Sequence, residues 1–211
     1  MSEEDRIARK TRRQARKRAR ILEVAEEVLV EFGLPGFTVA AVAERADLSK
    51  PSVYYYFESR EALLSALLAD HFARETHALL DAVERAESGL GALEAMMRAF
   101  VAHHRDDYAG FRALQIWALS GDAPPDLMAQ EVYPLSWKLM GELEAKLERD
   151  RADGALSADV EPRRLANVAL MTVHGIVNVH AGMDAMGAGL RYELDGLLDE
   201  ACANLVRGAK A

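Results

Sequence analysis

The chain of 211 residues carries a net charge of −8, and half of its residues are hydrophobic. A chain of this length and composition can bury one or two cores, which excludes a largely disordered protein. Its apolar runs are far shorter than a membrane span, and no apolar signal core opens it, so we expect a cytoplasmic protein without membrane contact. The single cysteine, Cys202, excludes an internal disulfide framework and fits a reducing compartment.

The charge is distributed unevenly along the chain. Residues 1–20 contain nine Lys and Arg against three acidic residues, whereas residues 61–211 hold 14 basic and 24 acidic residues, a net charge of −10. An acidic body is repelled by phosphate, so only the N-terminal part is suited to approach a nucleic acid. A basic terminus by itself is more often a solvated tail. We interpret residues 1–16 as a flexible basic arm.

Apolar residues recur at intervals of three and four throughout the chain, and strand signals are almost absent. This pattern predicts an all-α protein of about nine helices. The first predicted helix spans about 17–32 and ends at Gly33. A long helix follows Ser59, and Gly89 and Gly91 are expected to separate it from the next one. The last two predicted helices span about 162–182 and 191–207.

Two short helices joined by a tight turn are predicted between residues 38 and 57. Thr38 is a suitable N-cap for the first, and Ser49 for the second, which has Pro51 in its first turn. Asp47 belongs to the few residue types that tolerate the left-handed backbone that such a turn needs. Together with the preceding helix, this pattern predicts a three-helix helix-turn-helix domain over residues 17–60, the arrangement that presents side chains to DNA.

The residues from Arg18 to about Leu68 resemble the TetR family of bacterial transcriptional regulators in a long pattern of fixed register. The pattern consists of Ile21-Leu-x-x-Ala25, Phe32-Gly33, Thr38-x-x-x-Val42-Ala43-x-x-Ala46-x-Leu48-Ser49, Val53-Tyr54-Tyr55-Tyr56-Phe57 and Ser59-Arg60-Glu61-Ala62-Leu63. The remaining two-thirds resemble the family only in helix number and length. The resemblance implies a homodimer that binds a palindromic operator and releases it when a small molecule enters the larger domain, here residues 61–211. It favours a repressor over an activator.

Three positions depart from the usual family pattern. Asp47 stands where glycine is common, and Pro51 replaces a glycine, which removes one possible backbone donor to phosphate. Arg60 stands where lysine is usual, which preserves a positive charge for the DNA backbone.

The predicted DNA-facing residues lie on or around the second short helix, in which Val53 and Phe57 are expected to be core. Polar and basic side chains suit phosphate or base edges, and tyrosines suit phosphate and thymine methyl groups. A run of three tyrosines could instead be a packing cluster, but three in a row cannot all be buried. The predicted set is Arg18, Thr38, Ser49, Lys50, Ser52, Tyr54, Tyr55, Tyr56 and Arg60.

Methionine, aromatic and polar residues on the middle helices are candidates for an apolar ligand cavity, although such residues are as often plain core. The predicted ligand-binding set is Met97, Phe100, His104, Phe111, Trp117, Trp137, Met140, Met171, His174 and Asn178. It indicates a hydrophobic small-molecule effector. No two of the six histidines have the i, i+4 spacing of a helical metal-ligand pair, so we predict neither a metal site nor a cofactor.

Small residues in the penultimate helix, Gly175, Ala181 and Gly182, permit close helix approach. With the last helix they predict a four-helix homodimer seam, and two reading helices in a dimer imply a pseudo-palindromic DNA operator. The rival hypothesis is a helical-bundle enzyme or small-molecule carrier without sequence-specific DNA binding. An enzyme would need a nucleophile–base or paired-carboxylate constellation, and no spacing in the sequence indicates one. We therefore expect a non-enzymatic regulator.

Overall fold

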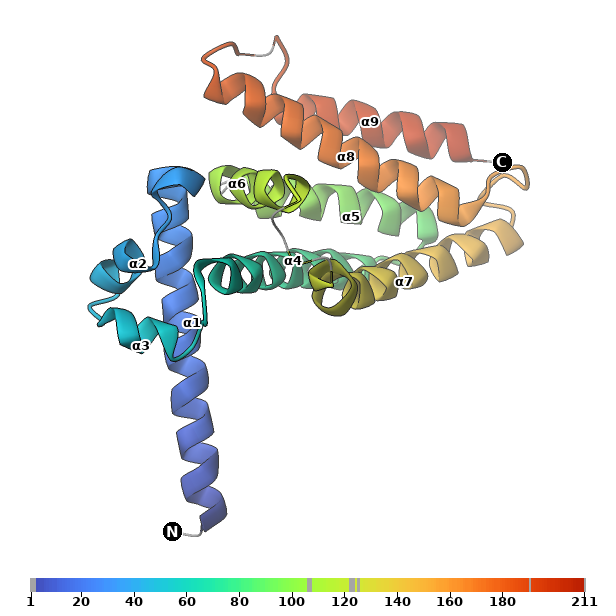
Figure 1. The fold of residues 1–211 in the computed structure, drawn as a ribbon. Coiled ribbons are helices and arrows are strands. Elements are labelled where there is room, and N and C mark those ends of the chain that lie inside the picture. Colours follow the sequence, from blue (N-terminus) through green and yellow to red (C-terminus); the bar gives the residue numbers. More distant parts are fainter. Residues whose placement is uncertain (1–2, 106–107, 122–123, 125, 190, 211) are drawn as a thin grey trace. The chain divides into compact units, whose positions relative to one another are not determined.

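The computed structural model of the protein describes residues 3–105, 108–121, 124, 126–189 and 191–210 (Figure 1). Within these residues the chain is helical, with one isolated backbone bridge between Leu156 and Lys210, which confirms the predicted all-α class. The elements are α1 (Glu3–Gly36), α2 (Val39–Arg45), α3 (Lys50–Tyr54), α4 (Arg60–Arg85), α5 (Gly89–His104), α6 (Tyr108–Leu119), a π-helical turn (Met128–Val132), α7 (Tyr133–Ala152), α8 (Pro162–Ala185) and α9 (Leu194–Ala209).

The described chain contains no helix that is long and apolar enough to cross a membrane.

The structure divides into two compact units. The first contains residues 1–71 and 109–127, and the second contains residues 72–108 and 128–211. The boundary therefore falls inside α4, because the apolar stripe of this helix continues past residue 60 without a linker. The functional division at residue 60 that the sequence suggests stays a prediction.

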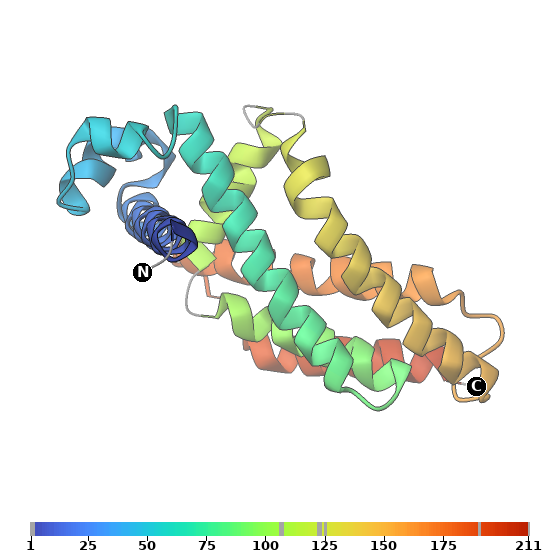
Figure 2. The same ribbon diagram turned by 90° about the horizontal axis from the view of Figure 1, so that it is seen from below.

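In the first unit, α1 is longer than predicted. It begins at Glu3, so the segment expected to be a flexible arm is helical, and the helix turns sharply at Gly33, whose φ is +62°. Figure 2 views the N-terminal part of α1 nearly end-on. Only the C-terminal half of α1 is anchored by apolar burial, since Ile21, Val24 and Leu29 are buried whereas residues 15–20 are exposed. The flexible arm over residues 1–16 is predicted from the concentration of Lys and Arg, and this composition does not exclude a helix.

The capping predictions for the short helices are confirmed. The backbone N–H of Ala41 donates to Thr38 Oγ1 at 3.1 Å, and that of Ser52 donates to Ser49 Oγ at 3.3 Å. Similarly, the N–H of Ala62 donates to Ser59 Oγ at 3.0 Å at the start of α4. Local hydrogen bonds of this kind satisfy N–H groups that have no partner within the helix.

The second unit is a helical bundle in which α5 packs against α7, α8 and α9. Its core is mainly apolar, and its fully buried residues include Leu93, Met96, Met97, Phe100, Leu143, Leu147 and Val173. Figures 1 and 2 show α8 and α9 running alongside each other, consistent with their packing contact.

The glycines expected to break the chain before the fifth helix lie within it instead. Ser88 is the N-cap of α5 and accepts a hydrogen bond from the N–H of Gly91. A Cβ on Gly89 would lie 2.6 Å from the backbone of Leu147 in α7. The buried carboxylate of Asp150 also accepts the N–H of Leu90 at 2.8 Å. Gly89 thus permits the close approach of two helices, which a local sequence pattern does not reveal.

Candidate DNA interface and buried polar cluster

The turn between α2 and α3 has the backbone geometry that the sequence predicted. Asp47 adopts the left-handed conformation with φ of +53°, and the N–H of Leu48 donates to Ala43 O at 2.9 Å, which ends α2. Ser49 then starts α3 in an extended conformation. The two helices contact each other, and α2 also contacts α1, so α3 is held in a defined orientation.

Burial separates the side chains of α3 and its exit into two faces. Val53 is fully buried and Phe57 is 3% exposed, as predicted for core residues. In contrast, Lys50 is exposed, Tyr54 is 49% exposed and Tyr55 is 69% exposed. The buried face fixes the helix while the opposite face presents a lysine and two tyrosines to solvent.

The remaining predicted DNA-facing residues lie around this exposed face. Thr38 and Ser49 are exposed, and Ser49 Oγ lies 2.8 Å from Ser52 Oγ. Tyr56 is half-buried, and its ring meets that of Tyr55 edge-on, with centroids 5.0 Å apart. The structure therefore exposes hydroxyl, phenol and ammonium groups at the starts of α2 and α3 and at the end of α3.

Two residues of α1 contact the end of α3. Gln14 Nε2 donates to the Tyr55 hydroxyl at 2.9 Å, and the Arg18 guanidinium lies 5.0 Å from the centroid of the Phe57 ring. These contacts join the N-terminal half of α1 to the predicted reading helix. Sequence reasoning missed Gln14, because its partner lies 41 residues away.

Arg60 makes hydrogen bonds within the first unit, and its predicted contact with DNA stays a prediction. Its Nε donates to Phe37 O and its Nη2 donates to Leu34 O, both at 2.8 Å. The guanidinium also lies 5.8 Å from the centroid of the Phe37 ring. Arg60 thus ties the start of α4 to the chain that follows the Gly33 turn, and its donors are engaged within the first unit.

The predicted ligand-binding residues divide by burial. In the second unit, Met97 and Phe100 are fully buried, and Met140 is 5% exposed. Trp117 is buried in the first unit. Trp137 is 62% exposed, so it does not belong to a buried cavity in this structure. It stacks on the exposed Tyr133 instead, with ring centroids 5.9 Å apart. The side chain of Phe111 lies outside the described residues.

Helices α4, α5 and α8 bring polar side chains together inside the second unit. His104 Nε2 lies 2.8 Å from Glu75 Oε2, and both residues are more than nine-tenths buried. The Phe100 ring lies between two imidazoles, with centroids 4.5 Å from His104 and 4.2 Å from His174. Burial lowers the pKa of His174, while the nearby Glu75 raises it and His104 lowers it further.

The polar cluster extends one turn along α8. The Tyr108 hydroxyl donates to Asn178 Oδ1 at 2.5 Å, and Asn178 Nδ2 donates to the backbone oxygen of His174 at 2.9 Å. Of these residues, sequence reasoning missed Glu75. The available indication was its phase, since Glu75 falls seven residues after Leu68 and four before Leu79 on the apolar stripe of α4.

One face of α8 exposes a long apolar stripe. Val168 is 43% exposed, Met171 72%, Val179 58% and Met186 70%. With the helical period of 3.6 residues these positions fall on one side of α8, and Gly175 lies on the same side. Met171, predicted as a cavity residue, therefore belongs to an outward surface, because it lies opposite the buried Val173 and Val177 face.

A sequence model described as bacterial regulatory proteins, tetR family, matches residues 21–67. The chain is 35% identical over 91 residues to the HTH-type transcriptional regulator BetI of Burkholderia mallei (strain NCTC 10229), which covers 43% of this chain and 45% of that protein. The chain thus aligns with less than half the length of this curated relative.

Solved structures resemble the fold over nearly the whole chain. A structure on the control of antibiotic production by a bacterial hormone has a TM-score of 0.71 and 27% identity, covering 93% of this chain and 98% of that chain. A TetR family transcription regulator from Marinobacter aquaeolei VT8 has a TM-score of 0.69 and 18% identity, covering 95% and 98%.

The capped helix-turn-helix lies in the segment that matches the model of bacterial regulatory proteins, tetR family, and the fold along nearly the whole chain is similar to that of solved structures that include a TetR family transcription regulator.

Proposed function

We propose that the protein is a DNA-binding transcriptional repressor that reads its operator with α3. The observation that carries this proposal is the division of α3 into a buried face and an exposed face. Val53 and Phe57 anchor the helix, and Lys50, Tyr54 and Tyr55 project into solvent. A short, rigid helix with exposed polar side chains suits the major groove of B-DNA.

The surrounding groups divide into base readers and backbone contacts. Lys50 and Ser52 are within one turn of the start of α3 and suit base edges or nearby phosphates. Thr38, Ser49 and the tyrosine hydroxyls suit phosphate oxygens, which position a protein on the duplex without reading its sequence. We assign Arg18 to the DNA backbone and leave Arg60 out of the interface, since its donors are engaged with Leu34 and Phe37.

The protein acts as a homodimer through α8 and α9 in this proposal. The exposed stripe of Val168, Met171, Val179 and Met186 supports a helix–helix seam, because a long apolar face on one helix is normally covered by another. A two-fold seam presents two copies of α3, which suits a pseudo-palindromic operator with half-sites about one helical turn or more apart.

The cluster around Glu75, His104 and His174 supports an effector site in the second unit. Buried ionisable groups are expensive to desolvate, and they contribute little to stability compared with apolar packing. Their presence among Met97 and Phe100 therefore suits a hydrophobic small molecule that carries one polar end. Effector binding then favours a different position of α4 in each protomer. This change alters the distance between the two copies of α3 in the dimer and releases the DNA.

The test is binding of the purified protein to the DNA that flanks its own gene, measured by fluorescence anisotropy. Lys50→Ala is expected to weaken operator binding by about 1–3 kcal/mol. Lys138→Ala, at an exposed site on α7, is the matched control and leaves binding unchanged. The effect on a random-sequence duplex separates base reading from phosphate contact.

Operator binding that persists unchanged in a Lys50→Ala, Tyr55→Ala double variant contradicts the proposed interface. An absence of any binding by the wild type at low salt contradicts the regulator itself and favours a small-molecule carrier.

A further inference from the structure

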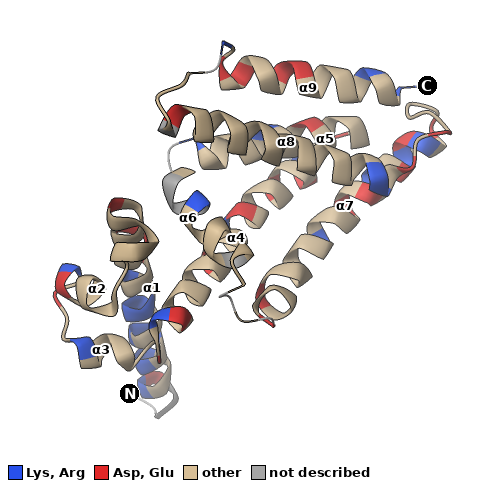
Figure 3. Ribbon diagram, turned by 45° about the horizontal axis from the view of Figure 1, so that its top comes forward, with Lys and Arg blue, Asp and Glu red and all other residues tan. Residues whose placement is uncertain are grey.

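The N-terminal half of α1 is a strongly basic helix. Residues 6–20, which we term the basic extension, contain nine Lys and Arg and no acidic residue. All of them except the half-buried Gln14 are exposed. Figure 3 shows Lys and Arg gathered along this part of α1. The first buried residue of α1 is Ile21, so packing against the core of the helix-turn-helix domain does not explain why residues 6–20 are helical.

Two features hold the basic extension in a defined direction. It continues without interruption into the segment of α1 whose Ile21, Val24 and Leu29 are buried. Gln14 also donates to the hydroxyl of Tyr55, at the end of α3. At 1.5 Å per residue, the eleven residues from Glu3 to Arg13 extend about 16 Å beyond this contact. The extension is therefore a rod that starts beside the reading helix.

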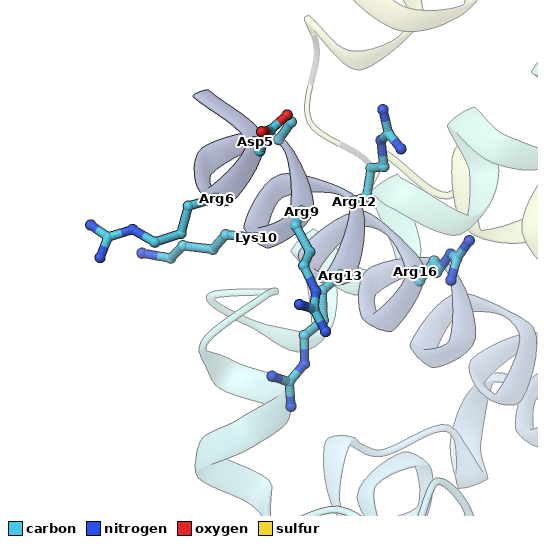
Figure 4. A pocket seen from close by; sticks show the side chains of 8 residues that line it. Asp5, Arg6, Arg9, Lys10, Arg12, Arg13 and Arg16 are labelled. Carbon is cyan, nitrogen blue, oxygen red and sulfur yellow. The ribbon is translucent and has the colours of Figure 1, made fainter. Parts of the chain in front are cut away.

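The charges cover several sides of the helix. In Figure 4, Arg6 and Lys10 project to one side and Arg9 and Arg13 to another, and Arg12 points away from both pairs. These pairs are four residues apart, and like charges at this spacing repel each other and destabilise an isolated helix. A polyanion alongside the helix removes this repulsion and favours the helical form.

The composition identifies the polyanion as duplex DNA. A helix that lies on a membrane needs a broad apolar face, and Ile7 is the one large apolar residue of the basic extension. B-DNA carries a phosphate charge about every 1.7 Å along its axis, so a 16 Å rod passes enough phosphates for each of its basic side chains. The neighbouring α3 would already hold the protein at the duplex.

We propose that the basic extension is a second DNA-binding element, a rigid helix that contacts phosphates outside the sequence read by α3. Its place beside the duplex rests on the proposed function, whereas its attraction to phosphate does not. It adds affinity and salt dependence without sequence preference, because Lys and Arg contacts to phosphate carry no base information.

The first experiment measures the salt dependence of binding of the full chain to a 30-base-pair random-sequence duplex. The test variant replaces Arg6, Arg9, Lys10 and Arg13 with Gln. The control variant lowers the net charge by the same amount, because it replaces with Gln four exposed basic residues outside the first unit, Arg85, Lys138, Arg149 and Arg207. Losing about four phosphate contacts lowers the log–log salt slope by about 3.6, so the wild type's advantage shrinks by about 100-fold between 50 and 200 mM salt.

The second experiment separates a rigid helix from a flexible arm. Ala15→Pro breaks the helix between residues 6–13, which carry the four substituted charges, and the buried segment that begins at Ile21, without changing charge, because proline removes a backbone donor and clashes with the preceding turn. Ala15→Gln keeps the helix and is the matched control. We expect Ala15→Pro to reduce the slope toward that of the fourfold variant and Ala15→Gln to match the wild type.

The outcomes distinguish this proposal from the proposed function. A slope that the fourfold substitution leaves unchanged overturns the DNA-binding element, and a wild-type slope in Ala15→Pro overturns its rigidity. Stronger binding to vesicles of anionic phosphatidylglycerol than to DNA at equal charge also overturns it. If the slope depends on the basic extension but the protein shows no operator preference, only the reading role of α3 fails.

Discussion

Replacing Arg60 with alanine tests whether this residue stabilises the fold of the first unit or contacts DNA. The side chain makes two hydrogen bonds of 2.8 Å, to Leu34 O and Phe37 O. If these bonds are its role, Arg60→Ala destabilises the first unit and leaves the salt slope of DNA binding unchanged. If Arg60 contacted phosphate, the slope would fall and stability would hold.

The size of the effect follows from these two contacts. A hydrogen bond from a charged donor contributes about 1.5–3 kcal/mol when it is well protected. The side chain of Arg60 is 36% exposed, so water replaces part of each lost bond. We therefore expect Arg60→Ala to lower the unfolding free energy of the first unit by about 2–4 kcal/mol. Arg60→Lys recovers part of this, because an ammonium is a point donor that matches the two carbonyls less well than the guanidinium fork.

The assay uses the natural distribution of tryptophan. The chain contains two, the buried Trp117 in the first unit and the exposed Trp137 in the second. In a Trp137→Phe background, Trp117 fluorescence during urea denaturation reports the first unit alone. Arg85→Ala is the control, since its ion pair with Asp81 is exposed and contributes less than about 1 kcal/mol.

An Arg60→Ala protein with wild-type unfolding and a reduced salt slope would refute the structural role and restore the contact with the DNA backbone.

Three further predictions follow from the second unit. Gly89→Ala places a Cβ 2.6 Å from the backbone of Leu147 and should destabilise the protein by about 1–3 kcal/mol, measured by thermal unfolding, whereas Gly141→Ala, where a Cβ meets nothing within 4 Å, should not. The pKa of His174 is lowered from its usual 6.5, so the unfolded chain binds a proton at a higher pH than the folded chain does. The free energy of unfolding therefore rises with pH, and the contribution of His174 decreases as the pH falls below about 6.5. His174→Gln should flatten this dependence in urea titrations at several pH values, and an unchanged slope would contradict it. Val179→Glu should convert a dimer to monomers in sedimentation experiments, and a dimer that survives it excludes the α8 seam.

Local features of the fold were predictable from the sequence because short-range interactions decide them. The caps at Thr38, Ser49 and Ser59 each use a side-chain oxygen and an N–H three residues later, so the sequence contains both partners. The left-handed conformation of Asp47 was predictable for the same reason, since few residue types tolerate it. Burial of Val53 and Phe57 followed from helical phase.

Features that depend on distant partners were not predictable. Gly89 was expected to break a helix, but its role is the approach to the backbone of Leu147, 58 residues later in the chain. Arg60 was assigned to DNA because the family pattern has a basic residue there, and only the fold reveals Leu34 O and Phe37 O as its acceptors. Met171 lies on a helix whose pattern contains more than one apolar face, and packing decides which of them is inside.

The all-α class, the capped helix-turn-helix and the concentration of positive charge at the N-terminus follow from the amino-acid sequence alone. These depend on helical period, on caps within three residues and on composition. The packing of the helices, in contrast, reveals that the basic segment continues α1 as a helix beside Tyr55, and that Glu75, His104 and His174 meet within one core. Such arrangements bring together residues that are far apart in sequence, and their free energy depends on packing between helices rather than on local propensity.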